Sequence, residues 1–137
     1  MPATVLLIDD DSDFRAAVKP LLESHGYKVL EASSGDEGLR MVTEQKPDVI
    51  LLDIMMETTV EGYAITYSLR YRDEYAEFRK IPIFMMSSIE EGPDERFPMS
   101  AEVALIRPDG YLTKPLNIPE LLRLLEKAVG ATKGAPV

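Results

Sequence analysis

One residue of this sequence is especially suited to chemistry: a single carboxylate at the end of an apolar run. Asp53 ends the run 49–53, and the residues before it are all of the kind found in buried strands. A strand that is apolar at every position is covered on both faces, as in the middle of a parallel sheet, and ligands gather at the carboxyl ends of such strands. Asp53 is therefore predicted to lie in a binding site.

Three other apolar runs end in groups that would complement this carboxylate. Asp9 and Asp10 follow the first run, Ser87 follows the fourth, and Lys114 stands near the end of the fifth. Converging acids repel one another by a few kcal/mol at an effective dielectric of about 20, so cations must share the site. Lys114 supplies one charge, and Mg²⁺, which prefers carboxylates, waters and a phosphate, would supply the other. Carboxylate, hydroxyl, ammonium and Mg²⁺ together predict a pocket for a phosphoryl group.

Strands and helices alternate along the chain and would position these residues. Apolar runs predict strands over residues 4–8, 27–32, 49–53, 81–86 and 110–115. Helices are predicted from Ser12, which would cap the first one, to Gly26, from the Ser34 and Glu37 capping box to Glu44, over 63–78, and after the Asn117 and Glu120 pair. The first helix has apolar positions that include Phe14, and Pro20 is expected to kink it or end it early. A short helix could form within 97–106, between prolines.

Five strands joined to helices by short loops predict an α/β fold with right-handed crossovers and a doubly wound parallel sheet that carries helices on both faces. The length of 137 residues and the hydrophobic content of 45% fit one domain with a real core. This domain is predicted over residues 3–130, followed by a flexible tail over 131–137.

Composition excludes several functional classes. The chain has no cysteine, which rules out disulfides, thiolate chemistry and sulfur-ligated metals. Its formal net charge of −9 argues against binding to nucleic acid, which requires lysine and arginine to neutralise phosphates. No apolar run is long enough to span a bilayer and no signal peptide is recognisable, so a cytoplasmic protein is expected.

Four segments carry a more specific signal: LLIDDD, ILLDIMM, MMSS and GYLTKP. In this order they resemble the receiver domain of two-component response regulators, and the resemblance extends from about Thr4 to Val129. It implies the flavodoxin-like strand order 2-1-3-4-5. It also implies a phosphoacceptor signalling protein, which is not an enzyme beyond catalysing its own phosphoryl transfer and slow dephosphorylation.

By this resemblance Asp53 is the phosphoacceptor, which takes a phosphoryl group from the phosphohistidine of a sensor histidine kinase or phosphotransfer protein. Asp10 would bind Mg²⁺ directly and Asp9 directly or through water. Asp53 itself and the backbone carbonyl of Met55 would complete the protein ligands of the metal. The bound ion would offset the charge on the phosphoryl oxygens during in-line transfer.

The same resemblance assigns the remaining residues of the site. Ser87 and Lys114 would each contact one phosphoryl oxygen, and the peptide before Pro115 matches a position that is often cis. Tyr111 resembles the switch aromatic, which turns inward when Ser87 moves toward the phosphate. The signal would pass to an unknown downstream protein by contact, because no effector domain follows, and the protein would be a monomer or a phosphorylation-dependent dimer.

Three features depart from the family pattern. Glu57 stands where a proline is usual, and Gly62 comes one residue late, so the loop after Asp53 is altered. The chain between Ser87 and Lys114 is several residues longer than usual and contains three prolines. Apolar residues, Met55 and Ile89, occupy the two positions that control access of water to the acyl phosphate, which predicts slow hydrolysis.

Two other functions fit parts of the sequence. A degenerate receiver would never take phosphate and would act only as a binding module, which the intact set of acid, hydroxyl and lysine disfavours. A phosphatase similar to the haloacid dehalogenases would use Asp9 as nucleophile, with Asp11 two residues later. That family needs a further acidic pair late in the chain, and only scattered acids follow Ser88.

Overall fold

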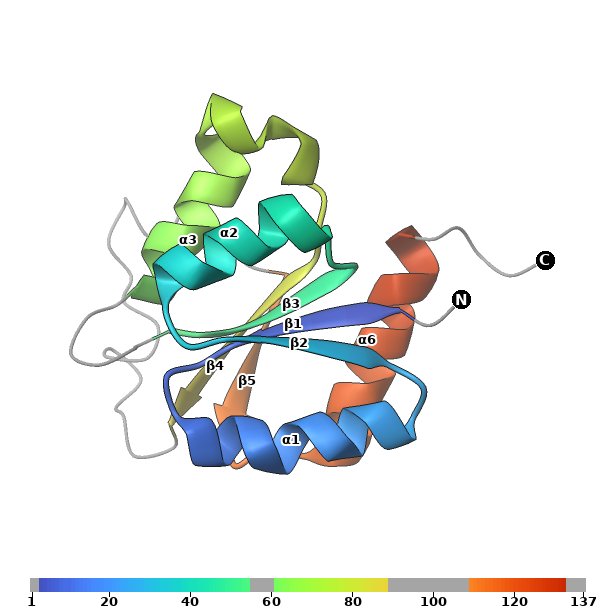
Figure 1. Cartoon of the computed structure of the whole chain (residues 1–137). Coiled ribbons are helices and arrows are strands. Elements are labelled where there is room, and N and C mark those ends of the chain that lie inside the picture. The colour runs from blue at the N-terminus through green and yellow to red at the C-terminus, as the bar shows by residue number, and fades with distance from the viewer. Residues whose placement is uncertain (1–2, 55–60, 89–108, 133–137) are drawn as a thin grey trace.

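A five-stranded parallel sheet in the order β2-β1-β3-β4-β5 forms the centre of the protein (Figure 1). This confirms the predicted doubly wound α/β fold with the flavodoxin-like strand order. The computed structural model describes residues 3–54, 61–88 and 109–132. Its elements are β1 (Thr4–Ile8), α1 (Ser12–Ser24), β2 (Lys28–Ala32), α2 (Gly35–Gln45), β3 (Val49–Asp53), α3 (Glu61–Tyr71), the 3-10 helix η1 (Asp73–Phe78), β4 (Ile83–Ser88), β5 (Gly110–Lys114) and α6 (Ile118–Thr132).

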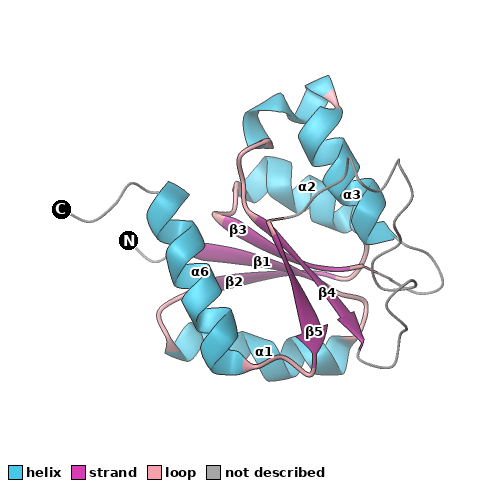
Figure 2. Ribbon diagram, turned by 180° about the vertical axis from the view of Figure 1, so that it is seen from behind, coloured by secondary structure: helices cyan, strands magenta, loops and turns pink. Residues whose placement is uncertain are grey.

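Two apolar cores cover the two faces of this sheet. Alternate side chains of β1 explain the division, since Val5 and Leu7 pack with α1 and α6, whereas Leu6 and Ile8 pack with α2 and α3. Figure 2 shows the same arrangement, with α2 and α3 on one side of the sheet and α1 and α6 on the other. A strand covered on both faces has no solvent side, which is why the central runs are apolar at every position.

Two predicted helix caps are present in the structure. At the start of α2, the backbone N–H of Glu37 donates to the hydroxyl of Ser34 at 3.2 Å. At the start of α6, the N–H of Glu120 donates to the side-chain oxygen of Asn117 at 3.0 Å. Each cap satisfies a backbone donor that has no partner inside the helix.

The first helix has a different cap from the one predicted, and it does not end early. Its cap is Asp11, one residue before the predicted Ser12, and the Asp11 carboxylate accepts from the N–H groups of Asp13 and Phe14. The expectation that the helix ends early at Pro20 is wrong, because α1 continues to Ser24. Pro20 is exposed, so its missing donor and its ring fall on the solvent side of the helix.

The single long helix predicted over 63–78 is also wrong. Arg72 has an extended backbone (φ −82°, ψ 133°) that separates α3 from η1. On an unbroken helix Phe78 would point half a turn away from Leu69, because nine residues advance the side chain by about two and a half turns. The break instead allows Phe78 and Leu69 to be buried in the same core.

The fourth strand begins later and ends later than predicted. It was expected over 81–86 with the two serines beyond it, but β4 runs over Ile83–Ser88. Asp53 is paired in register with Met86, and Ser87 lies opposite Thr113 of β5. Ser87 thus lies one position beyond the level of Asp53, and it is fully buried.

The remaining boundaries lie close to their predictions. The second strand begins at Lys28 instead of residue 27, α2 ends one residue after Glu44, and α6 extends to Thr132, into the stretch predicted as a tail. Residues 133–137 and the short helix expected within 97–106 lie outside the described residues. Among the helices that the structure describes, none has the length and apolar character needed to cross a membrane.

An arginine joins three segments at the end of the sheet where β4 and β5 begin. Arg70 of α3 donates to the carbonyls of Arg79 at 2.7 Å and Ile81 at 3.2 Å, and it pairs with Asp109 at 2.9 Å. The same Asp109 oxygen accepts the backbone N–H of Ile83 at 2.8 Å. Asp109 thus fixes the first residue of β4 and the end of α3 beside the start of β5.

We expect Asp109→Ala to lower the free energy of unfolding by about 1–2 kcal/mol, because it leaves a partly buried N–H and an arginine without their acceptor. Urea denaturation followed by far-ultraviolet circular dichroism measures this loss. The control is Asp73→Ala, which removes an ion pair with Arg79 (3.4 Å) at an exposed position and should cause no measurable change. Equal losses in the two variants would contradict a structural role for Asp109.

Candidate functional site

The carboxyl ends of the strands bring the predicted site residues to one edge of the sheet. Asp9 directly follows β1, Asp53 is the last residue of β3, and Lys114 is the last residue of β5. The Lys114 Nζ lies 2.6 Å from Oδ2 of Asp9 and 3.5 Å from Oδ2 of Asp53. Side chains 105 positions apart in the sequence therefore meet directly, and a lysine bridges two acids.

Three carboxylates form a cluster that fits a divalent cation. Asp9, Asp10 and Asp53 each offer an oxygen, and these oxygens lie within 4.8 Å of one another. Two oxygens on opposite sides of Mg²⁺ lie about 4.2 Å apart, so small rotations would let the three carboxylates share one ion. Asp9 and Asp53 are buried and Asp10 is exposed, which gives the cluster one open side. Hard oxygen donors without sulfur or imidazole match Mg²⁺ in chemical type.

The ammonium of Lys114 is the cation of this site. Burial alone would lower its pKa, but the hydrogen bond to Asp9 and the negative charges of Asp53 and Asp9 outweigh burial and raise the pKa above its ordinary value. Lys114 is therefore charged throughout the neutral range. The ammonium also lies over the ring of Phe14, 4.3 Å from the ring centroid.

The hydroxyl of Ser87 is a buried polar group that has no hydrogen-bond partner among the described residues. Ser87 is 0% exposed, and its Oγ makes no hydrogen bond within the described part of the chain. Buried hydroxyls are normally hydrogen-bonded, so this one calls for a specific explanation. Its place in β4, one position beyond the level of Asp53, makes it a candidate donor for a ligand at the strand ends.

Two residues of α1 support the site and were not recognised as such from the sequence. Arg15 donates through Nη1 to the backbone carbonyl of Asp9, and its Nε pairs with Glu31 of β2 at 3.1 Å. Phe14 was predicted only as an apolar helix position. Arg15 lies four residues after the capping Asp11, within reach of the end of β1, and this spacing is the one signal that could have identified it.

Of the remaining residues singled out in the sequence, some are described by the structure and others are not. Tyr111 of β5 is 43% exposed, which is an outward position. The Lys114–Pro115 peptide is cis, as the resemblance implied. Met55, Glu57 and Ile89 lie outside the described residues, so the backbone ligand and the two hydrolysis positions remain predictions.

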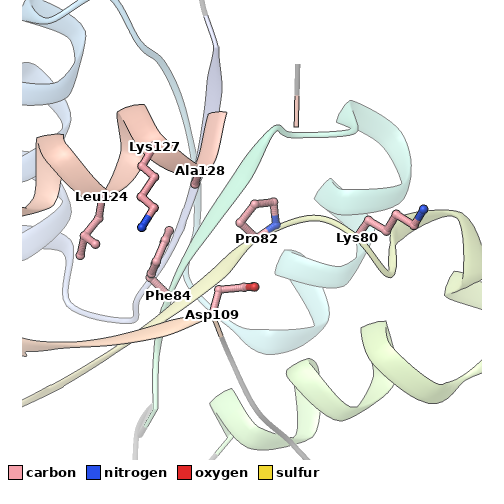
Figure 3. Close-up of a pocket in the computed structure, with 7 residues that line it drawn as sticks. All are labelled: Lys80, Pro82, Phe84, Asp109, Leu124, Lys127 and Ala128. Atoms are coloured by element: carbon pink, nitrogen blue, oxygen red, sulfur yellow. The ribbon is translucent and has the colours of Figure 1, made fainter. Parts of the chain in front are cut away.

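A cavity of about 370 Å³ lies away from this cluster, where β4 and β5 begin (Figure 3). Its lining comes from the segment before β4, from β4 itself, from the residue before β5 and from α6. The one carboxylate in its lining is Asp109, which is engaged by Arg70. Its lining residues are Lys80, Pro82, Phe84, Asp109, Leu124, Lys127 and Ala128. The cavity lacks the converging acids needed for a phosphoryl site.

Comparison with known proteins agrees with this geometry. The family model of the response regulator receiver domain matches residues 5–126. The polar-differentiation response regulator DivK of Brucella anthropi is 28% identical over 95% of this chain and 98% of its own length, and Protein PilH of Pseudomonas aeruginosa is 29% identical over 90% and 94%. The chain spans about half the length of several transcriptional regulators that it also matches, which are covered to between 46% and 52%.

A solved structure shares both the fold and part of the sequence. The chemotaxis protein CheY4 of Vibrio cholerae has a TM-score of 0.74 and is 30% identical, with 93% of this chain and 99% of that chain covered. The strand order and the acidic edge described above are thus accompanied by similarity over nearly the whole chain. We conclude that this chain belongs to the family of receiver domains of two-component response regulators.

Proposed function

We propose that the protein is a phosphoacceptor of a two-component phosphorelay, with Asp53 as the residue that takes the phosphoryl group. One observation carries the proposal: Lys114 bridges Asp9 and Asp53 at the carboxyl edge of the sheet. This places a fixed cation beside a buried carboxylate, where it would stabilise charge on an incoming phosphoryl group.

In the proposed reaction, an oxygen of Asp53 attacks the phosphorus of a phosphohistidine on a sensor kinase or phosphotransfer protein. The O–P bond forms as the N–P bond breaks, and the released histidine nitrogen keeps its electron pair. Lys114 donates to one phosphoryl oxygen. Ser87 donates its buried hydroxyl to another, which would give that hydroxyl the partner it lacks.

A magnesium ion would be held by Asp9, Asp10, Asp53 and the backbone carbonyl of Met55. When bound, it would supply positive charge to the phosphoryl oxygens during transfer. The first three of these residues form the carboxylate cluster, which supports the assignment. Arg15 would hold the backbone of Asp9 in place through its bond to the Asp9 carbonyl.

The proposed output is contact with another protein, since a chain of net charge −9 is unsuited to direct binding of nucleic acid. Tyr111 would be the moving part and would turn inward when Ser87 engages the phosphoryl group. The phosphatase alternative is disfavoured because that family needs a further acidic pair late in the chain, and only scattered acids follow Ser88. The first experiment below distinguishes the phosphoacceptor from a binding module that takes no phosphate.

Incubation of the full chain with Mg²⁺ and a small acyl phosphate donor should add one phosphoryl group to Asp53, located by mass spectrometry of peptides. Asp53→Asn should abolish the addition, whereas Asp13→Asn, which alters an exposed acid of α1, should not. Label on Asp9 would instead indicate the phosphatase. A chain that takes no label with donor and metal in excess would be the binding module.

Lys114→Met should have opposite effects on metal binding and on phosphorylation. Loss of a competing cation beside Asp9 should tighten Mg²⁺ binding by roughly tenfold, measured by isothermal titration calorimetry. Loss of a donor to the phosphoryl group should slow labelling of Asp53 by roughly a hundredfold. Lys80→Met, at an exposed position outside the acidic cluster, is the control. Weaker metal binding in Lys114→Met would contradict the proposed arrangement of charges.

Phosphorylation should bury the ring of Tyr111. Nuclear magnetic resonance of the tyrosine rings in the presence of a soluble paramagnetic agent measures this change, with Tyr111→Phe used to assign the signal. Tyr67, which is 48% exposed on α3, serves as the internal reference and should remain accessible. If the ring of Tyr111 is as accessible after phosphorylation as before it, Tyr111 is not the switch residue.

A further inference from the structure

Among the described residues, the ammonium of Lys114 contacts two acids and one aromatic face. It lies 2.6 Å from Asp9, 3.5 Å from Asp53 and 4.3 Å from the centroid of the Phe14 ring. The negative face of an aromatic ring attracts a cation, and the attraction strengthens when water is excluded. The Lys114 side chain is only 20% exposed, so this contact is largely shielded.

Phe14 belongs to a closed series of contacts that begins and ends at Asp9. The N–H of Asp11 donates to Oδ1 of Asp9 at 2.9 Å, and the Asp11 carboxylate accepts the N–H of Phe14 at 3.2 Å. The Phe14 ring faces Lys114, and Lys114 donates to Oδ2 of Asp9. The helix cap, the ring, the lysine and the acid therefore fix one another's positions.

From this geometry we propose that Phe14 is a positioning residue, whose ring holds the Lys114 ammonium between Asp9 and Asp53 in the orientation needed for phosphoryl acceptance. The inference rests on the proposed function of Asp53. A lysine side chain has many rotamers, and ordering one costs conformational entropy. A ring that excludes water from one side of the ammonium leaves its donors directed at the acids, so the lysine is ordered before the phosphoryl group arrives.

Phe14 also packs against the core formed with α1 and α6, so loss of packing must be separated from loss of positioning. Two substitutions separate these roles. Phe14→Leu keeps an apolar side chain but removes the ring, and Phe14→Tyr keeps the ring. Phe78→Leu is the matched control, because it removes a buried ring from the opposite core, where no lysine contact is present among the described residues.

The first readout is the rate at which Asp53 is labelled by a small acyl phosphate in the presence of Mg²⁺. Phe14→Leu should slow labelling by roughly two- to fivefold, which is the range given by a cation–π contact of ordinary strength. Phe14→Tyr and Phe78→Leu should label at close to the original rate. In the Lys114→Met background, Phe14→Leu should cause no further slowing, because the two side chains act as a unit.

The second readout reports the position of the lysine without any reaction. In protein labelled with ¹³C-lysine, the Cε and Hε signals of Lys114, assigned with Lys114→Met, should be shifted upfield by the ring. The shift should disappear in Phe14→Leu and persist in Phe14→Tyr and Phe78→Leu.

The two readouts distinguish failure of this proposal from failure of the proposed function. The positioning role is overturned if Phe14→Leu labels at the original rate, if it slows labelling equally without Lys114, or if the Lys114 signals are unchanged. If the original chain takes no label but the upfield shift of its Lys114 signals disappears in Phe14→Leu, the ring–lysine contact stands and the phosphoacceptor function fails.

Discussion

Repulsion between carboxylates is the constraint that shapes this protein. Parallel strands bring Asp9 and Asp53 to the same edge of the sheet, where both are buried. Buried carboxylates whose oxygens lie within 4.8 Å of one another are tolerated only with a cation between them. Lys114 is that cation, and β5 must lie at its place in the sheet order for the lysine to reach both acids.

The sequence predicts the scaffold well because the scaffold follows from local pattern. Runs such as 5–8 and 49–52 are apolar throughout since both faces are covered, so strand type and parallel pairing could be inferred without coordinates. The caps at Ser34 and Asn117 follow from residue type and spacing. The strand order itself came from the family resemblance, because periodicity carries no information about which strands are neighbours.

Prediction failed where tertiary contacts decide the outcome. The break at Arg72 follows from the need to bury Phe78 and Leu69 on one side, which a local helical pattern does not reveal. For the site, the acids, the hydroxyl and the lysine could be named because each follows an apolar run. The contact of Phe14 could not be named, because a ring beneath a lysine 100 residues away leaves no trace in local spacing. Arg15 was marked only by its place four residues after Asp11, within reach of the end of the first strand.

The hydroxyl of Ser87 bears on the stability of the fold, because it is buried and has no hydrogen-bond partner in the part of the chain that the structure describes. A buried hydroxyl without a partner costs about 1–3 kcal/mol of folding free energy. Since no partner for this hydroxyl is present within the described residues, a ligand oxygen placed there would gain part of this amount as binding free energy. Such a domain should gain heat resistance when a ligand supplies that oxygen, so that its melting temperature reports whether the strand-end site is occupied.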